Sequence, residues 1–137
     1  MSIKEWPTND YLVIVESPFA GDRVRNILYA RACIKDCLER GEYPFASHLL
    51  YTQPGILDDN DPNERQQGID AGLAWMVVAA KTVVYLDLGL STGMKYGIEN
   101  ASKYGKPIEF RNLDPEKVPP PSEESEDVLD LMRKGKL

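Results

Sequence analysis

The sequence predicts an α/β domain built around a small parallel sheet. Apolar runs rich in β-branched residues occur at 11–15 and 82–86, and a further strand candidate lies at 107–110. Continuous apolar runs of this length are typical of strands buried on both faces. Segments with helical periodicity separate these runs. Strands that alternate with helices favour an open sheet of parallel strands flanked by helices.

The first strand leads through a turn into a long helix. Pro18 and Gly21 mark the turn over residues 16–22, and Gly41 is expected to end the helix. One face of this helix is apolar and includes Val24, Ile27, Leu28, Ile34 and Leu38.

A short second strand is predicted at 44–50, followed by a polar loop over 51–61. The next helix has a clear start, because Asp61 can cap it, Pro62 suits its first turn and Glu64 can complete a capping box. Its apolar face consists of Ile69, Leu73, Met76, Val77 and Ala80.

The strand at 82–86 is followed by a loop over 88–92 and a helix over 93–104, which Gly105 stops before the strand at 107–110. These elements make up a domain over residues 1–113.

Residues 114–137 are expected to form a tail. The tail contains three prolines at 119–121 and an acidic stretch at 122–127, a composition typical of a linker. Residues 128–132 predict either a short amphipathic helix that docks on a partner or a frayed end.

Length and charge limit the class of protein. A chain of 137 residues suffices for one core and is too short for two. Its 16 Lys and Arg residues against 22 Asp and Glu give a net charge of -6, which argues against nucleic acid polymers and anionic membranes as partners. No leader pattern opens the sequence and no apolar stretch is long enough to span a bilayer, so we expect a cytoplasmic protein.

Cys33 and Cys37 lie one helical turn apart, and the chain has a single histidine to join them as a ligand. The neighbouring Asp36 and Glu39 favour the protonated thiols. We therefore expect two reduced thiols, with no disulfide, no metal and no cofactor.

Candidate site residues follow the strands, because ligands in open α/β sheets bind outside the carboxyl ends of the strands. Four segments qualify: 16–22, 47–52, 87–94 and Arg111. Their glycines, hydroxyls and aromatic rings suit a small polar ligand.

The turn over residues 87–93 joins a strand to the amino end of a helix. Free backbone N–H groups and the helix dipole favour an anion there, and the hydroxyls of Ser91 and Thr92 add donors. The alternative is that Ser91 only caps the helix.

Together, the loop at 17–22, the Ile69–Asp70 pair, the strand ending at Asp87 and the segment from 91–94 to 105–107 resemble the nucleoside 2-deoxyribosyltransferase-like superfamily. The resemblance covers residues 11–111. It is greatest to an uncharacterised, often phage-borne or actinobacterial branch, whose motifs occur here at 17–22, 48–53 and 87–91.

The resemblance implies a flavodoxin-like fold of about five strands and a homo-oligomer, a dimer or larger. It also implies cleavage or transfer of the N-glycosidic bond of a nucleoside or nucleoside 5′-monophosphate. Ser91 matches the position that binds the 5′-phosphate in the superfamily's nucleotide hydrolases, and Asp70 matches an acidic position near the sugar or base. The loop at 17–22 matches the one that lies over the ligand.

One position departs from the superfamily. Its nucleophilic Glu, which attacks the anomeric carbon, aligns with Gly97 here. Glu99 projects from nearly the opposite side of the helix and cannot replace it.

Inverting hydrolysis needs only a base that activates water. Asp87 and Asp70 are the leading candidates for this base and Glu16 is the third, while His48 can protonate the leaving base or can simply hydrogen-bond a loop. Tyr51 is a candidate for stacking, and Arg65 can bind phosphate or form a surface ion pair. The expected substrate-binding residues are Glu16, Ser17, Pro18, Phe19, Gly21, Asp22, Tyr51, Gly89, Ser91, Thr92, Gly93 and Met94.

Three functions remain open. The first is an enzyme acting on the N-glycosidic bond, which the resemblance favours. The second is a non-catalytic module that binds or sequesters a nucleotide or nucleotide-derived signal, which Gly97 favours. The third is a structural oligomer that recruits a partner through its acidic tail.

Overall fold

The computed structural model describes residues 9–123 and 128–135. Its helices and strands follow one another as β1 (Leu12–Glu16), α1 (Arg23–Glu39), β2 (Tyr43–Phe45), α2 (Ser47–Leu50), α3 (Pro62–Val78), β3 (Lys81–Tyr85), α4 (Thr92–Lys103), β4 (Ile108–Arg111) and α5 (Val128–Arg133).

The sheet has four strands in the order β2-β1-β3-β4, and each neighbouring pair is parallel. The predicted α/β fold with a parallel, flavodoxin-like sheet is therefore confirmed, with four strands in place of about five in the part of the chain described. The order reverses between β1 and β3, since β2 lies on one side of β1 and β3 on the other.

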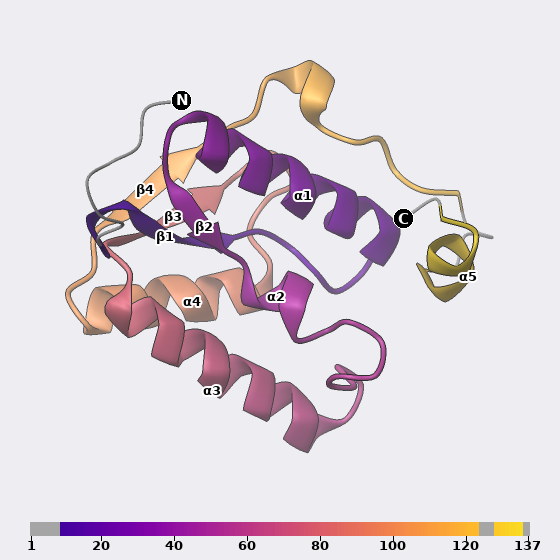
Figure 1. Cartoon of the computed structure of the whole chain (residues 1–137), viewed down its shortest axis with the longest axis horizontal. Coiled ribbons are helices and arrows are strands. Elements are labelled where there is room, and N and C mark those ends of the chain that lie inside the picture. The colour runs from indigo at the N-terminus through magenta and orange to yellow at the C-terminus, as the bar shows by residue number, and fades with distance from the viewer. Residues whose placement is uncertain (1–8, 124–127, 136–137) are drawn as a thin grey trace.

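Helices cover the sheet on both faces. α1 lies over one face, and α3 and α4 lie over the other (Figure 1). Successive residues of β1 point to opposite faces of the sheet. Val13 and Val15 pack with Tyr29 of α1, while Ile14 packs with Met76 of α3. This alternation also decides the direction in which side chains at the strand ends point.

The second strand is shorter than predicted. The expected strand at 44–50 ends at Phe45, and the following residues form the single turn of α2. The amides of Leu49 and Tyr51 bond to the carbonyls of Ala46 and Ser47, so local bonds replace those of a longer strand ladder.

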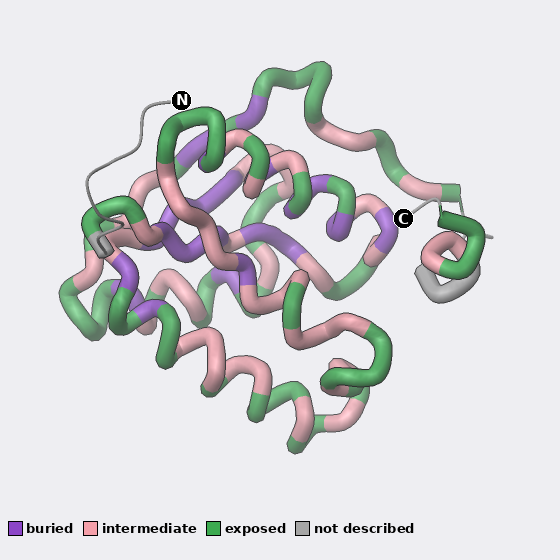
Figure 2. Tube along the Cα trace, in the orientation of Figure 1, coloured by how far each residue is buried: buried purple, intermediate pink, exposed green. Residues whose placement is uncertain are grey.

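Burial is uneven between the two helical layers. Figure 2 shows buried residues concentrated in the strands and along α1, while α3 is exposed or intermediate over nearly its whole length. Met76 is the buried residue of α3. α3 is therefore less closely packed on the sheet than α1.

The segment after β4 returns to the start of α1. Arg25 Nε donates to the carbonyl of Pro119 at 2.8 Å, and the Ser122 amide donates to Asp22 Oδ2 at 2.9 Å. The described helices include none that is long and apolar enough to cross a membrane.

Candidate active site

A cavity of about 750 Å³ opens at the carboxyl ends of β1 and β3, where the strand order reverses. Its walls are the end of β1 and the segment after it, α2, one side of α3 from Glu64 to Met76 and the start of α4. The volume lies within the range of sites for small organic ligands. The predicted residues that line it are Glu16, Ser17, Phe19, His48, Tyr51, Ser91, Thr92, Gly93 and Met94.

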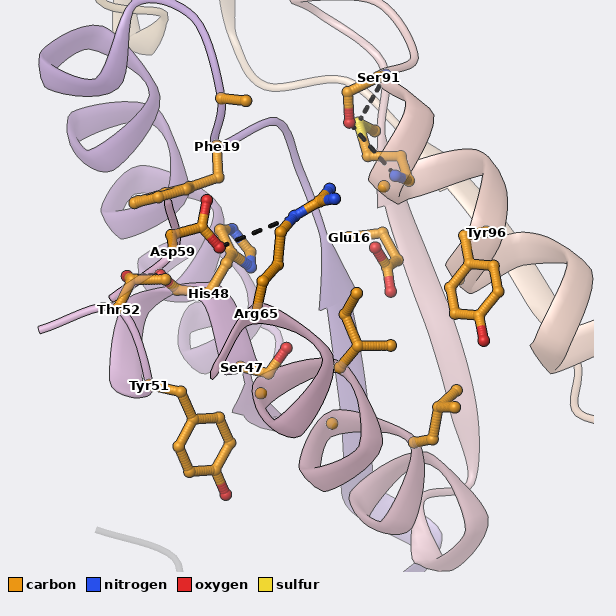
Figure 3. Close-up of a pocket in the computed structure, with 18 of the residues that line it drawn as sticks. Glu16, Phe19, Ser47, His48, Tyr51, Thr52, Asp59, Arg65, Ser91 and Tyr96 are labelled. Carbon is orange, nitrogen blue, oxygen red and sulfur yellow. Dashed lines mark hydrogen bonds and ion pairs between the residues drawn. The ribbon is translucent and has the colours of Figure 1, made fainter. Parts of the chain in front are cut away.

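Glu16 is the last residue of β1 and lines the cavity. It shares the face of Ile14, so its side chain lies beneath α3 and α4 (Figure 3). Within residues 9–123 and 128–135, no hydrogen bond or ion pair reaches its carboxyl group. Burial raises the pKa of this group from 4.5 to about 8, because the charged form loses its hydration without gaining a partner.

Gly97 of α4 lies directly against this carboxyl group. A Cβ atom at position 97 would lie 2.3 Å from Glu16 Oε1 and 2.6 Å from Glu16 Cδ. Only glycine leaves room for the carboxyl group in this position. The carboxyl group of the strand thus occupies the space into which a side chain at 97 would extend.

His48 and Ser17 form a polar pair in the cavity lining. Ser17 Oγ lies 2.8 Å from His48 Nε2, and the His48 ring contacts Phe19 edge-on at 6.3 Å between centroids. Burial lowers the pKa of His48 to about 4, so its ring is neutral at physiological pH.

The amino end of α4 forms the wall next to β3. Ser91 caps the helix, and its Oγ accepts from the Met94 amide at 3.2 Å. Thr92 and Gly93 also line the cavity. The positive end of the helix dipole therefore lies at the cavity wall.

Asp59 and Arg65 line the opposite side (Figure 3). Arg65 Nε lies 3.9 Å from Asp59 Oδ1, and Arg23 also pairs with Asp59 at 3.7 Å. Asp59 was not among the candidates, and a polar loop in the sequence carries no signal for it. Position 97 was already noted in the sequence as the place of the superfamily's nucleophilic Glu, but the contact of Gly97 with Glu16 was not expected.

The aromatic residues near α2 pack on one another. The Trp75 indole donates to Tyr51 Oη at 2.9 Å, and Phe45 packs on Trp75 at 4.9 Å between ring centroids. Tyr51 lines the cavity with its hydroxyl group already engaged.

Asp87, a leading candidate for the base, points to the opposite face of the sheet. Its Oδ2 accepts from the Tyr29 hydroxyl at 2.6 Å and from the Leu113 amide at 3.0 Å. It lies two residues after Tyr85, which packs toward α1. Asp87 is therefore absent from the cavity lining and ties α1 to the segment after β4.

Other candidates also lie outside the cavity lining. Asp70 is on an exposed part of α3, where Gln66 donates to it at 2.9 Å. Asp22 caps α1 and accepts from Ser122. Arg111 is buried on the α1 side, paired with Glu42. Pro18, Gly21 and Gly89 lie in the adjoining loops and do not line the cavity.

Both cysteines are buried and free. No group of three or more His, Cys, Asp or Glu side chains suited to a metal ion occurs among the residues that the structure describes.

A family model described as a domain of unknown function (DUF7768) matches residues 11–111. A similar solved structure comes from work on a 2-deoxyribosyltransferase of the psychrotolerant bacterium Bacillus psychrosaccharolyticus. It shares 17% identity and a TM-score of 0.54, over 74% of this chain and 72% of that one. At this identity the similarity shows a common fold. No curated protein matches the sequence.

Proposed function

The chain belongs to the DUF7768 family, a domain of unknown function, and we propose that it is an enzyme that cleaves the N-glycosidic bond of a nucleoside or nucleoside 5′-monophosphate. The observation that carries the proposal is the unpaired carboxyl group of Glu16, held against Gly97 inside a cavity of ligand size. The fold shared with a 2-deoxyribosyltransferase supports the same class of chemistry.

Glu16 supplies the carboxylate that Gly97 lacks. The resemblance stated above places a nucleophilic Glu at position 97, and Glu16 brings its carboxyl oxygens into the space beside that position from β1. Glu16 lines the cavity, whereas Asp87 and Asp70 do not, so it is the better candidate for the base. The roles first expected of Asp87 and Asp70 stay predictions.

We assign Glu16 the role of general base in hydrolysis. A water proton passes to the carboxylate as the water oxygen bonds to the anomeric carbon. The bond from that carbon to the heterocycle nitrogen breaks, and its electron pair goes to the nitrogen. The negative carboxylate also stabilises the positive charge that develops on the sugar.

The other cavity residues bind and orient the substrate. We assign His48 the neutral tautomer with its proton on Nδ1, in which the Ser17 hydroxyl donates to Nε2 and the Nδ1–H group is available to a ligand acceptor. With a pKa of about 4, His48 serves as a hydrogen-bond donor to the leaving base. The amino end of α4 at Ser91 suits a 5′-phosphate.

A panel of nucleosides and 5′-monophosphates tests this proposal, first by thermal shift and then by release of free base. We expect release by the wild type and a loss of about a hundredfold or more in Glu16→Gln. The matched control is Glu99→Gln, an acidic residue of α4 on the exposed surface and outside the cavity lining. Binding without release by the wild type would instead favour the non-catalytic nucleotide-binding module.

A further inference from the structure

Cleavage of an N-glycosidic bond leaves an electron pair on the heterocycle. A neutral purine or pyrimidine needs a proton to become a good leaving group, whereas a ring with a fixed positive charge becomes neutral as it leaves. The charges and proton donors of the cavity therefore bear on which substrates it suits.

Few groups in the cavity can supply that proton. His48 on α2 is neutral, with a pKa of about 4. Arg65 lies on α3, and an arginine side chain binds anions but is not an acid for a leaving group. Glu16 is occupied as the base. Besides Glu16, the carboxyl groups of the lining are those of Asp59, which pairs with Arg65 and Arg23, and Glu64. The lining of the described chain thus offers no imidazolium for protonating a leaving group.

The charges of the lining favour a cation. Its acidic residues are Glu16, Asp59 and Glu64, and its basic residue is Arg65. Arg65 pairs with Asp59, and no ion pair joins the carboxyl group of Glu16 to a cation among the described residues. A buried carboxylate without a counter-ion is strongly disfavoured, and a positively charged ligand would supply the counter-ion.

Aromatic rings in the wall suit a flat cation. Phe19, Tyr51 and Tyr96 all line the cavity, and the faces of such rings attract cations. The Phe19 ring already packs against the Arg23 guanidinium at 5.2 Å.

We propose that the substrate carries a fixed positive charge on its leaving heterocycle, as a pyridinium riboside or an N7-alkylated purine nucleoside does, and that Glu16 is its counter-ion. The inference rests on the proposed function for the bond that is cleaved. It adds the charge of the leaving group.

The step balances without an added acid. The cation holds Glu16 in its ionised form, and the carboxylate takes a proton from water. The water oxygen bonds to the anomeric carbon, and the electron pair of the broken C–N bond neutralises the ring. The products are the free sugar, the neutral heterocycle and protonated Glu16.

Matched pairs of probes test the charge by itself. One pair is the pyridinium riboside of nicotinamide and its neutral 1,4-dihydro form, and the other is N7-methylated adenosine and adenosine. Calorimetry at about pH 7, in buffers of different protonation enthalpy, gives the affinity and the protons released. Wild type, Glu16→Gln and Glu99→Gln are compared.

We expect at least one cation to bind the wild type about tenfold more tightly than its neutral partner. We also expect release of roughly 0.9 proton per ligand, because Glu16 is mostly protonated before binding at this pH. Both effects should vanish in Glu16→Gln and persist in Glu99→Gln. Equal affinity within both pairs, or a preference that survives in Glu16→Gln, would overturn the inference.

Release of the heterocycle separates this inference from the proposed function. If a cationic probe binds more tightly than its neutral partner but is never cleaved, the inference about charge stands and the proposed enzymatic function is refuted. Glu16-dependent hydrolysis of neutral nucleosides, with equal affinity within both pairs, would uphold the enzyme and refute the inference.

Discussion

The carboxyl group of Glu16 makes folding stability depend on pH, because its pKa rises from 4.5 to about 8 in the folded chain. Between these values the folded protein holds a proton that the unfolded chain has lost. The contribution of this one group to stability is therefore greatest below pH 4.5 and falls as pH rises toward 8, by up to about 1.4 kcal/mol per pH unit. A glutamine at position 16 has the same shape but does not ionise, so it adds no pH dependence to the stability.

Glu16→Gln is accordingly expected to be more stable than the wild type at about pH 8 and to match it near pH 4.5. Urea unfolding across this range measures the difference, with Glu99→Gln as the control for losing an acidic residue. If the unfolding free energies of Glu16→Gln and wild type differ by the same amount at every pH, the pKa of Glu16 is not shifted by folding.

Gly97→Ala tests the position of the same carboxyl group. The added Cβ would overlap Glu16 Oε1, but the carboxyl group is the mobile end of a side chain and can move into the cavity. We expect an unfolding free energy within about 1 kcal/mol of wild type and a loss of about a hundredfold in heterocycle release.

The double variant Glu16→Ala/Gly97→Ala is the control for stability, because the alanine at 97 then has room. Wild-type release by Gly97→Ala alone would mean that the position of the carboxyl group is unimportant for the chemistry.

At the scale of elements, an ionic network around the buried Arg111 joins β4, β3 and the segment before β2. Arg111 donates to both carboxyl oxygens of Glu42, at 2.7 and 2.6 Å, and also contacts Glu109. Lys81 Nζ lies 3.0 Å from Glu109 and 3.1 Å from Glu42. Hydrogen bonds from Arg111 and Lys81 lower the pKa of Glu109 to about 2. Desolvation raises the pKa of Glu42, but the same two cations outweigh it and lower that pKa too.

Arg111→Met should destabilise the fold by about 3 kcal/mol at neutral pH, because it leaves Glu42 without its main partner in a half-buried position. Both acids have lowered pKa values, so their contribution is present above pH 4.5 and disappears as pH falls toward 2. The difference in unfolding free energy between wild type and Arg111→Met, measured by urea unfolding, should therefore become smaller below pH 4.5. A gap independent of pH would assign the effect to packing.

Secondary structure was predicted well where local signals are strong. Asp61 caps α3 and Ser91 caps α4, as their side chains suggested. The strand expected at 44–50 was wrong beyond Phe45, because an edge strand has one neighbour and local turn bonds compete with its ladder.

For the whole molecule, the alternation of β strands with α helices was enough to predict the parallel sheet, and the rule for open sheets indicated the edge at which the cavity lies. The sequence could not tell Glu16 from Asp87 as the acid in the cavity. Both follow continuous apolar strands with helices on both faces, so the pattern does not reveal which face stays open. That choice depends on how far α3 stands from the sheet.

The tail segment contributes to the domain through Pro119 and Ser122. A chain ending at residue 123 keeps these contacts, whereas one ending at 113 loses them together with the packing of Val118 on the core. Thermal unfolding should show a midpoint several degrees lower for the shorter chain than for the longer one. Equal midpoints would mean that the segment over 114–123 adds nothing to stability.

The central claim is that the ionised Glu16 carboxyl group acts on the glycosidic bond, and the pH dependence of kcat/KM for heterocycle release tests it most directly. Measured between about pH 5.5 and 9.5, the kcat/KM of the wild type should rise about tenfold per pH unit and level off above a pKa of about 8. Glu16→Gln should lie at least about a hundredfold lower without this rise. A wild-type rate that is flat through pH 8, or a Glu16→Gln rate close to that of wild type, would contradict the account.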